Sequence, residues 1–532
     1  MAGLATVLGS GAMTNSIDDA TKASTILLMG SNATETHPVI GAKIKQAIRK
    51  GSKLVVADPR KTELARLADI HLQLKPGTDA ALLNGLLHII IDKHLVDKEY
   101  ISQHTEGYEQ LAEHVKSYTP ERVSAITGVP VHLMRQAALT YGRAAAAAVL
   151  YTMGITQHSN GTDNVLAIAN LALATGNLGR PGTGINPLRG QNNVQGSCDM
   201  GALPNVLPGY VPVEQANQRF GQIWQAQLPE QKGMTVGQMI DGGVRALYVM
   251  GENPMLSDPD GSHVAQCLDN LDFLVVQDIF LTETAERADV VLPAASFAEK
   301  EGSFTNTERR VQKVNQAIAP VGQSRPDWQI ICDIAQRLGH NWHYSFPGEI
   351  FAEINQAVPA YGGFDYNSLE SDGRHWPCPE TDHPGTPILH AQGPARGRGV
   401  FTAVDYKGPG EAADEQYPYT LTTGRILFHY HTGTMTRNAR GLGKHRKEEQ
   451  AEINPADAAA LGIASGDRVK ITSRRGSVET AVIVTDRVPE KVVFMTFHFR
   501  ESAANILTGN FVDPVSLTPE LKVAAVAIEK VV

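Results

Sequence analysis

Short apolar runs separated by polar turns organise the first part of the chain. Residues 25–29 read Thr-Ile-Leu-Leu-Met before Gly30, and residues 53–57 form a second run that ends at Asp58. Apolar runs of this length, bounded by turn residues, are typical of buried parallel strands. Residues 38–50 between them read as a helix, so the segment predicts a strand–helix–strand unit.

The same order of runs returns near the middle of the chain. Residues 247–253 read Leu-Tyr-Val-Met-Gly-Glu-Asn, similar to Ile-Leu-Leu-Met-Gly-Ser-Asn at 26–32, and the run 274–278 again ends in aspartate. Glycine and aspartate recur at nearly matched offsets, which a shared α/β architecture alone does not require. We therefore predict two Rossmann-like dinucleotide-binding halves related by an internal repeat, with polar groups at the carboxyl ends of their strands. Chance similarity of two α/β units is the alternative.

The residues at the strand ends indicate what kind of nucleotide the two halves bind. The turn after residue 29 lacks the G-x-G-x-x-G motif, which argues against an ordinary nicotinamide site. Asp58 and Asp278 close the second strand of each half, where an acid suits a ribose hydroxyl or a purine edge. A helix cap is the alternative role for aspartate there. Two such halves facing one another predict two nucleotide tails in a shared cleft.

The last part of the chain changes to strand patterning. From Tyr417 onward β-branched residues and turn signals dominate, and residues 466–478 carry a strong hairpin signal, so we predict a β-barrel. His429 and His431 alternate on a predicted strand, and for them we favour ligand contact or solvation over metal binding. The predicted domains are a first α/β cofactor-binding domain, a second one, a connecting mixed segment and the C-terminal barrel, at residues 1–191, 192–310, 311–410 and 411–532.

Composition narrows the class of protein. The 532 residues are 42% hydrophobic and 19% charged, as in soluble globular proteins, and the net charge of -9 argues against a nucleic-acid partner. No apolar run approaches the roughly 20 residues that span a membrane. The four cysteines form no C-x-x-C pair, so their spacing supports neither a zinc site nor an iron–sulfur cluster. No signal peptide is visible, and we expect reduced thiols and a cytoplasmic location.

A loop rich in amides and glycine lies between the two halves. Residues 186–201 read N-P-L-R-G-Q-N-N-V-Q-G-S-C-D-M-G, without helical or strand periodicity. Arg189 has a planar fork that matches a carboxylate in a bidentate way. Amide side chains that add neutral donors for a ligand surround it: Asn186, Gln191, Asn192, Asn193 and Gln195. We predict a small-anion site here; a surface loop rich in turn-forming residues is the alternative.

With its flanks, this loop resembles a known family. The stretch L-R-G-Q-N-N-V-Q-G-S-C-D-M-G-A-L-P follows T-G-N-L-G-R-P-G-T-G-I-N-P and precedes V-V-Q-D-I-F-L-T-E-T-A. The chain thereby closely resembles, over nearly its whole length, the catalytic (alpha) subunits of molybdopterin-dependent formate dehydrogenases in the dimethyl-sulfoxide-reductase superfamily. The resemblance implies a bis(molybdopterin guanine dinucleotide) cofactor with molybdenum or tungsten. It also implies oxidation of formate to carbon dioxide, or the reverse, with two electrons passed through a pterin to an iron–sulfur chain. The implied partners are iron–sulfur or other electron-transfer subunits.

The resemblance also assigns residues. Arg189 matches the substrate arginine of the family, and no residue of this chain is expected to bind the metal. Matches to cofactor-contacting stretches are Gly30, Asn32, Asp58, Arg60, Asp79, Met153, Gly154, Gln157, Gln191, Gly251, Asn253, Gln277, Asp278, Thr282, Arg425, His429 and Asn505.

The front of the chain departs from the family pattern. Family members begin with a four-cysteine segment for a [4Fe–4S] cluster and then carry a metal-ligating selenocysteine or cysteine followed by histidine. This chain starts as if just beyond that pair, so the cluster, the metal ligand and the first part of the second α/β domain are expected only upstream. We predict a selenocysteine codon taken as a stop, a GTG codon taken as Met1, and a chain that is inactive alone. The upstream DNA tests this, because an unrelated open frame without a TGA or cysteine codon would contradict it.

Three functions are therefore compared. A formate dehydrogenase is favoured. Another oxidoreductase of the superfamily, such as a nitrate reductase, is disfavoured by the R-G-Q-N-N loop. A non-catalytic scaffold that keeps the fold is disfavoured by the many polar residues retained at the predicted cofactor site.

Overall fold

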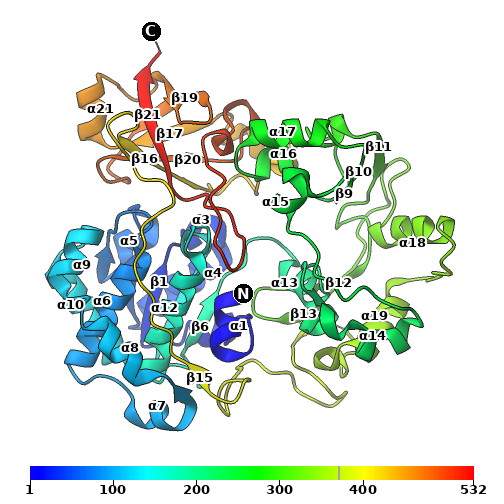
Figure 1. Ribbon diagram of the computed structural model, residues 1–532, viewed down its shortest axis with the longest axis horizontal. Coiled ribbons are helices and arrows are strands. Elements are labelled where there is room, and N and C mark those ends of the chain that lie inside the picture. The colour runs from blue at the N-terminus through cyan, green and yellow to red at the C-terminus, as the bar shows by residue number, and fades with distance from the viewer. Residues whose placement is uncertain (370–371, 532) are drawn as a thin grey trace. The chain divides into compact units, whose positions relative to one another are not determined.

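The computed structural model describes residues 1–369 and 372–531. The chain forms two compact units, and Figure 1 traces the elements of each. Unit 1 consists of residues 1–190 and 388–532, and unit 2 consists of residues 191–387. The predicted mixed α/β fold with a C-terminal barrel is confirmed.

Unit 1 is built on a parallel sheet. Its strand order is β3-β2-β1-β5-β6, and every neighbouring pair is parallel. The strands are β1 Thr25–Met29, β2 Lys53–Ala57, β3 Ile70–Leu72, β5 Ala147–Tyr151 and β6 Gly184–Pro187. The apolar runs that predicted β1 and β2 are thus strands at the centre of the sheet, covered on both faces.

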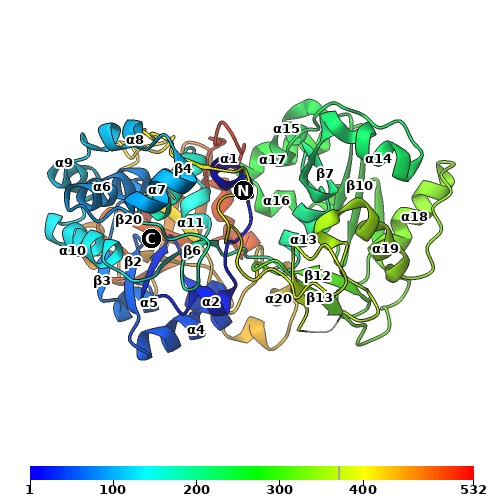
Figure 2. The same cartoon turned by 90° about the horizontal axis from the view of Figure 1, so that it is seen from below.

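The two faces of the sheet bury alternate side chains of β1. Leu27 and Met29 belong to the core shared with α6 (Asp79–Asp92), α10 (Val131–Gly142) and α12 (Gly161–Ala174). On the opposite face Ile26 and Leu28 pack with α4 (Pro38–Arg49). Figure 2 shows α4 and α6 on opposite sides of the strands.

Local signals account for several helix ends. Proline at the first position begins α4, as predicted from residue 38. In α9 (Pro120–Thr127) the Thr119 hydroxyl accepts a hydrogen bond from the backbone of Arg122, and Gly128 ends the helix with φ 76°. The first residues also form a helix, α1 (Ala2–Leu8), which packs on α12 with fully buried leucine and valine side chains.

The C-terminal part of unit 1 is a closed barrel with the strand order β16-β20-β17-β19-β18-β21. Its strands are β16 Tyr419–Gly424, β17 Gln450–Ile453, β18 Arg468–Thr472, β19 Ser477–Val484, β20 Val492–Thr496 and β21 Ala524–Lys530. The predicted hairpin is the antiparallel pair β18 and β19. A closed barrel leaves no open strand edge, which suits a segment rich in β-branched residues.

Unit 2 contains the second copy of the repeat. Strands β9 (Ala246–Met250), β10 (Phe273–Asp278) and β11 (Val290–Pro293) form a parallel sheet in the order β11-β10-β9. This order matches β3-β2-β1 of unit 1. Unit 2 also holds an antiparallel sheet of β12 (Gly302–Thr305), β13 (Arg310–Val314) and β14 (Arg374–His375).

No helix in the described part of the chain is long and apolar enough to cross a membrane.

Candidate functional site

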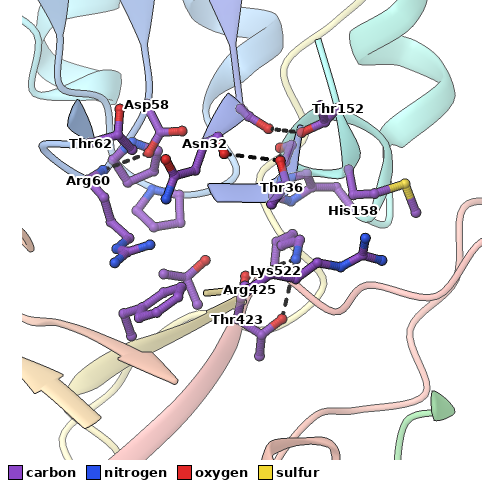
Figure 3. Close-up of a pocket in the computed structure, with 18 of the residues that line it drawn as sticks. Asn32, Thr36, Asp58, Arg60, Thr62, Thr152, His158, Thr423, Arg425 and Lys522 are labelled. Carbon is purple, nitrogen blue, oxygen red and sulfur yellow. Dashed lines mark hydrogen bonds between the residues drawn. The ribbon is translucent and has the colours of Figure 1, made fainter. Parts of the chain in front are cut away.

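A pocket in unit 1 lies between the carboxyl ends of the parallel strands and the barrel (Figure 3). Parallel sheets characteristically bind ligands at this edge. From the α/β part its lining includes eight residues that follow the strands or begin α6: Gly30, Asn32, His37, Asp58, Arg60, Asp79, Met153 and Gly154. It also includes Leu188 and Gly190, which follow β6, and from the barrel part Thr422, Thr423, Arg425, Phe494 and Lys522.

Two glycines bring the loops after β1 and β5 into backbone contact. Gly30 has φ 51°, and a Cβ added to it would lie 2.7 Å from the carbonyl carbon of Gly154. A Cβ added to Gly154 would lie 2.5 Å from the Gly30 oxygen. The Thr152 hydroxyl donates to that same oxygen. Only glycine, which has no Cβ, permits this close approach, so backbone packing accounts for the glycine at both positions.

Asp58 and Arg60 form the floor of the pocket after β2. The Asp58 carboxylate accepts a hydrogen bond from the Arg60 backbone at 2.8 Å, and burial raises the pKa of Asp58. The Arg60 guanidinium donates from Nη2 to both carboxylate oxygens of Glu452, at 2.9 and 2.8 Å. It also lies 3.4 Å from the centre of the Phe494 ring. Arg60 therefore joins the α/β part to the barrel, while its buried Nε has no hydrogen-bond partner among the described residues.

The residues that cap the helices after the second strands are threonines. Thr62 accepts a hydrogen bond from the Ala65 backbone, and Thr282 accepts one from the Ala285 backbone, each at 3.2 Å. Asp58 and Asp278 instead accept backbone hydrogen bonds within the turns before these threonines. Asp58 accepts from Arg60 at 2.8 Å, and Asp278 accepts from Ile279 at 2.6 Å. The alternative of a helix cap is thus wrong for both aspartates.

Cationic groups reach the pocket from the barrel. The buried Lys522 donates from Nζ to the Thr423 carbonyl oxygen at 2.8 Å, and burial lowers the pKa of Lys522 to about 7. Burial also lowers the pKa of Arg425. Two cationic groups at one wall suit a phosphate-bearing ligand. Sequence reasoning missed Lys522, because a lysine that precedes an apolar strand is ordinarily solvent-exposed.

A buried acid and a buried histidine lie at the α6 side of the pocket. Asp79 is the first residue of α6, and burial raises the pKa of Asp79 to about 6. His158, which sequence reasoning also missed, is 2% exposed and its Nε2 lies 2.8 Å from the Gly154 carbonyl oxygen. Its Nδ1 lies 3.8 Å from the buried carboxylate of Glu520 and makes no hydrogen bond among the described residues.

Arg189 follows β6, and it is not itself among the residues that line the pocket. Its neighbours Leu188 and Gly190 both line the pocket, and the Leu188 backbone donates to the Tyr151 carbonyl oxygen at 2.8 Å. Arg189 itself is partly buried. A Cβ added to Gly190 would lie 2.6 Å from Nη1 of Arg425, so glycine here lets a second guanidinium approach the loop.

Two of the amide side chains around Arg189 form hydrogen bonds with the protein backbone. The Asn186 side chain, fully buried, accepts a hydrogen bond from the Asn15 backbone in unit 1. In unit 2 the Asn193 side chain accepts from the Thr305 backbone at 2.9 Å. The oxygens of these two amides thus hold the loop. The expectation of an irregular loop is wrong in part, because residues 194–199 form helix α13 (Val194–Asp199).

A buried network holds that helix within unit 2. One carboxylate oxygen of Asp199 accepts from Gln195 at 2.8 Å and from Tyr210 at 2.7 Å, and the other accepts from Tyr361 at 2.7 Å. Arg309 of the same unit, also fully buried, donates to backbone carbonyl oxygens such as that of Thr386 at 2.8 Å, and burial lowers its pKa to about 9.

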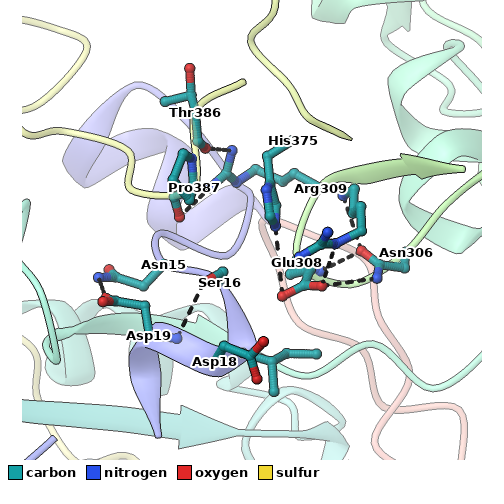
Figure 4. Close-up of polar contacts among 12 residues, drawn as sticks. Asn15, Ser16, Asp18, Asp19, Asn306, Glu308, Arg309, His375, Thr386 and Pro387 are labelled. Carbon is teal, nitrogen blue, oxygen red and sulfur yellow. Dashed lines mark hydrogen bonds and ion pairs between the residues drawn. The ribbon is translucent and has the colours of Figure 1, made fainter. Parts of the chain in front are cut away.

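Figure 4 draws the contacts of Arg309. It also draws a unit 1 cluster in which the Asn15 amide donates to Asp19 at 2.7 Å.

The histidines of the barrel are placed differently from the expectation. Strand β16 ends at Gly424, so His429 and His431 follow it in an irregular segment, and the predicted strand alternation is wrong. His429 is buried between the Thr436 hydroxyl and the Arg446 carbonyl oxygen, 2.8 Å from the latter. Burial lowers the pKa of His431 to about 4. No group of three potential metal ligands occurs within the described residues.

The other predicted residues fall into two sets. Three lie in unit 1 but are not among the residues that line the pocket: Gln157, His429 and Asn505. Six lie in unit 2: Gln191, Gly251, Asn253, Gln277, Asp278 and Thr282. Within unit 2, Gln277 donates to Asp327 at 2.7 Å, and Asn253 donates to Glu283 at 2.8 Å.

Comparison with known proteins gives matches over nearly the whole chain. Residues 4–337 match the family model described as Molybdopterin oxidoreductase, and residues 419–525 match Molydopterin dinucleotide binding domain. The F420-dependent formate dehydrogenase subunit alpha of Methanocaldococcus jannaschii is 50% identical over 99% of this chain and 80% of its own length. Formate dehydrogenase H of Escherichia coli is 39% identical over 100% of this chain and 76% of its own length.

Two further matches differ more from this chain. The first is named for a different activity, and the second has a much lower sequence identity. The assimilatory nitrate reductase catalytic subunit of Bacillus subtilis is 36% identical over 97% of this chain and 76% of its own length. Among solved structures, acetylene hydratase from Pelobacter acetylenicus has the same fold, with a TM-score of 0.77, 19% identity, and coverage of 99% of this chain and 80% of its own.

Proposed function

Because this chain belongs to the molybdopterin oxidoreductase family, we propose that it oxidises formate to carbon dioxide, or catalyses the reverse reaction, as a catalytic subunit. The observation that carries the proposal is the position of Arg189. It lies two residues beyond the end of β6, between two residues that line the pocket. A guanidinium at this edge matches the charge and the planar shape of formate.

The residues of the pocket fit a nucleotide-bearing cofactor. Asn32 Nδ2 and Arg60 Nε are buried without a hydrogen-bond partner among the described residues, so donors are available to a polar ligand. Lys522 and Arg425 offer positive charge for phosphate groups, and the carboxylate of Asp58 suits a ribose hydroxyl or a purine edge. We propose that these residues hold one dinucleotide of bis(molybdopterin guanine dinucleotide), with molybdenum or tungsten. When bound, the cofactor supplies the acceptor for the two electrons of formate.

Unit 2 holds the proposed contacts to the second dinucleotide. They are Gly251, Asn253, Gln277, Asp278 and Thr282, which lie at or after the carboxyl ends of β9 and β10. The remaining proposed cofactor contacts are Gly30, Asp79, Met153, Gly154, Gln157, Gln191, His429 and Asn505. We also propose that the chain is divided into two α/β cofactor-binding domains, a connecting mixed segment and the C-terminal barrel.

Arg189 does three things in the proposed reaction. It binds the carboxylate of formate through two parallel hydrogen bonds, and it thereby fixes the direction of the C–H bond. It also holds the negative charge in a partly buried place while the carbon is oxidised. Carbon dioxide carries no charge, so it leaves the guanidinium once formed. Partner subunits with iron–sulfur centres take the electrons.

Formate-dependent dye reduction by the metal-loaded, full-length enzyme tests the proposal. We expect Arg189→Lys to lower kcat/KM for formate by about 100-fold, because a point charge cannot replace the bidentate fork. Near-normal turnover of the lysine variant would contradict the role of Arg189. A nitrate reductase, the alternative, would reduce nitrate and leave formate untouched under the same conditions. Metal analysis of the purified protein separates both from a scaffold that binds no cofactor.

A further inference from the structure

We propose that His37 is a positioning residue for Arg189, whose backbone carbonyl it holds through a hydrogen bond from Nε2. This inference deepens the proposed function and rests on it for the role of Arg189 in substrate binding. The hydrogen bond itself does not depend on that role. The two residues are 152 positions apart in sequence, and both belong to unit 1.

The hydrogen bond assigns the proton on the ring. His37 Nε2 lies 2.8 Å from the Arg189 carbonyl oxygen. A carbonyl oxygen only accepts hydrogen bonds, so Nε2 carries a hydrogen in this arrangement. His37 also lines the pocket, so the bond lies at the border between the ligand site and the loop that carries Arg189.

The second ring nitrogen is held by the preceding residue. The Thr36 hydroxyl lies 2.7 Å from His37 Nδ1 and 3.0 Å from the Asn32 carbonyl oxygen. The hydroxyl has a single hydrogen, so when the ring is neutral it donates to Nδ1. Burial lowers the pKa of His37 and favours this neutral form. Thr36 thus orients the ring and leaves Nε2–H directed at Arg189.

The backbone of His37 is fixed by its place in the fold. It lies between the short helix α3 (Ala33–Thr36) and α4, and Pro38 follows it at the start of α4. Proline restricts the conformation of the residue before it. The ring therefore extends from a connection that is itself constrained, which is what an anchor for another loop requires.

Strand pairing ends shortly before Arg189. Residues 184–187 pair with β5, and the Leu188 backbone donates to Tyr151, but the strand pairing ends there. The His37 hydrogen bond comes next and acts on the Arg189 carbonyl, which shares a peptide plane with Gly190. Glycine has the fewest conformational restrictions, so an external hydrogen bond at this plane has a large effect on the direction of the arginine.

Two substitutions separate the hydrogen bond from the bulk of the ring. His37→Phe keeps a ring and removes the donor, whereas the amide nitrogen of His37→Gln can replace Nε2–H. The matched control is His114→Phe, since His114 Nε2 lies 2.9 Å from the Val404 carbonyl oxygen, also within unit 1. That histidine is not among the residues lining the pocket.

The first measurement is amide hydrogen exchange of residues 186–196 in the full-length protein. We expect exchange in this segment to rise about tenfold in His37→Phe, because one partly buried hydrogen bond is lost, and to stay within about threefold of the wild type in His37→Gln. His114→Phe leaves the segment unchanged. Equal exchange in the wild type and His37→Phe would overturn the proposal.

The second measurement is formate-dependent dye reduction by the enzyme loaded with its cofactor. We expect kcat/KM for formate to fall about tenfold or more in His37→Phe and to recover in His37→Gln, at unchanged Tm. A histidine that only stabilises the fold would lower Tm without this recovery by glutamine. Recovery of exchange without recovery of kcat/KM would also contradict a positioning role.

The two measurements distinguish the possible failures. If the full-length wild type loaded with its cofactor reduces no dye with formate, the proposed function fails, whereas hydrogen exchange still decides whether His37 anchors the loop. If His37→Phe does not fold, Thr36→Val serves instead, because it removes the partner of Nδ1 and keeps the ring. We expect about threefold faster exchange of residues 186–196 in that variant. Unchanged exchange in a folded Thr36→Val would overturn the proposal.

Discussion

The two copies of the repeat share their backbone contacts but differ in what surrounds them. The amide of Gly30 donates to the Ala57 carbonyl oxygen at 2.9 Å, and that of Gly251 donates to the Gln277 oxygen at 2.8 Å. Asp69 accepts from the first-copy β2 at 2.9 Å, and Asp289 accepts from β10 at 2.7 Å. These contacts need only a glycine and an acid at the right offsets.

Burial separates the copies. Every residue of β1 is buried, whereas β9 has one buried residue, Val249. The sheet of unit 1 has helices on both faces, while the three-stranded sheet of unit 2 leaves apolar side chains such as Met250 and Phe273 exposed within the unit. The repeat therefore encodes a turn and a pairing order of strands. The neighbouring helices determine how much apolar surface each strand buries, and so how much it contributes to stability.

The polar residues after the first strands differ as well. Asn32 has a buried Nδ2 without a hydrogen-bond partner in the described part of the chain. The equivalent Asn253 donates to Glu283 and accepts from the Thr284 hydroxyl at 2.7 Å. The first copy thus has a donor available for a ligand at a position where the second copy uses its amide to hold its own loop.

The glycine pair gives the largest expected difference between the copies. We expect Gly30→Ala to destabilise unit 1 by about 4 kcal/mol or more, because the added Cβ meets the Gly154 backbone at a positive φ. Gly251→Ala has no described heavy atom within 4 Å of its Cβ and should cost only about 1 kcal/mol for its positive φ. Chemical denaturation measures both, and equal losses would contradict the difference in packing.

The methionine pair tests burial directly. Met29 is fully buried and Met250 is 51% exposed, at equivalent positions of β1 and β9. We expect Met29→Ala to lower the free energy of unfolding by about 3 kcal/mol and Met250→Ala by less than about 1 kcal/mol. The measurement is urea denaturation of both variants beside the wild type. A loss in Met250→Ala as large as that in Met29→Ala would show that the second sheet is covered in solution.

Buried acids make the stability of both units depend on pH. Burial raises the pKa of Asp79 to about 6, and burial with Glu252 raises that of Asp258 to about 7. An acid whose pKa is higher in the folded state than in the unfolded state stabilises the fold when it is protonated. This stabilisation is fully present below about pH 4 and is lost as the pH rises through the folded-state pKa.

We therefore expect Asp79→Asn to raise the free energy of unfolding at pH 7.5 by about 2 to 3 kcal/mol relative to the wild type, and to have little effect at pH 4. Asp258→Asn should behave in the same way in unit 2. Thermal unfolding across this pH range measures both. The control is Asp18→Asn, which alters an exposed carboxylate and should leave the profile unchanged. Parallel profiles for the wild type and Asp79→Asn would contradict burial as the cause.

The asparagine pair gives the smallest expected difference in stability between the copies, and it separates stability from cofactor binding. We expect Asn253→Ala to cost about 2 kcal/mol, because it removes the hydrogen bonds that join Asn253 to Glu283 and Thr284. Asn32→Ala should cost less than about 1 kcal/mol, since its donor has no described partner to lose, but it should lower the cofactor content of the purified protein. Denaturation and metal analysis measure the two effects, and a reversed order would refute the comparison.

Much of the fold was predictable because its signals are local. The apolar runs at β1 and β2, the proline at the start of α4 and the hairpin of β18 and β19 each depend on a few consecutive residues. The repeat was visible for the same reason, since a glycine and an acid must keep their offsets to make the same contacts. Eight predicted cofactor residues come together in one pocket, because carboxyl ends of parallel strands and the segment after β16 meet there: Gly30, Asn32, Asp58, Arg60, Asp79, Met153, Gly154 and Arg425.

The remaining features depend on contacts between distant segments. The sequence alone determined the strand segments, the helix starts and the single arginine in an amide-rich loop, because these follow from spacing and side-chain type. Only the tertiary structure decided that Lys522 is buried beside the pocket, that Arg60 is paired with Glu452, and that His37 holds the Arg189 backbone. Burial and pairing of a polar group depend on which distant residue arrives opposite it, and no local pattern encodes that partner.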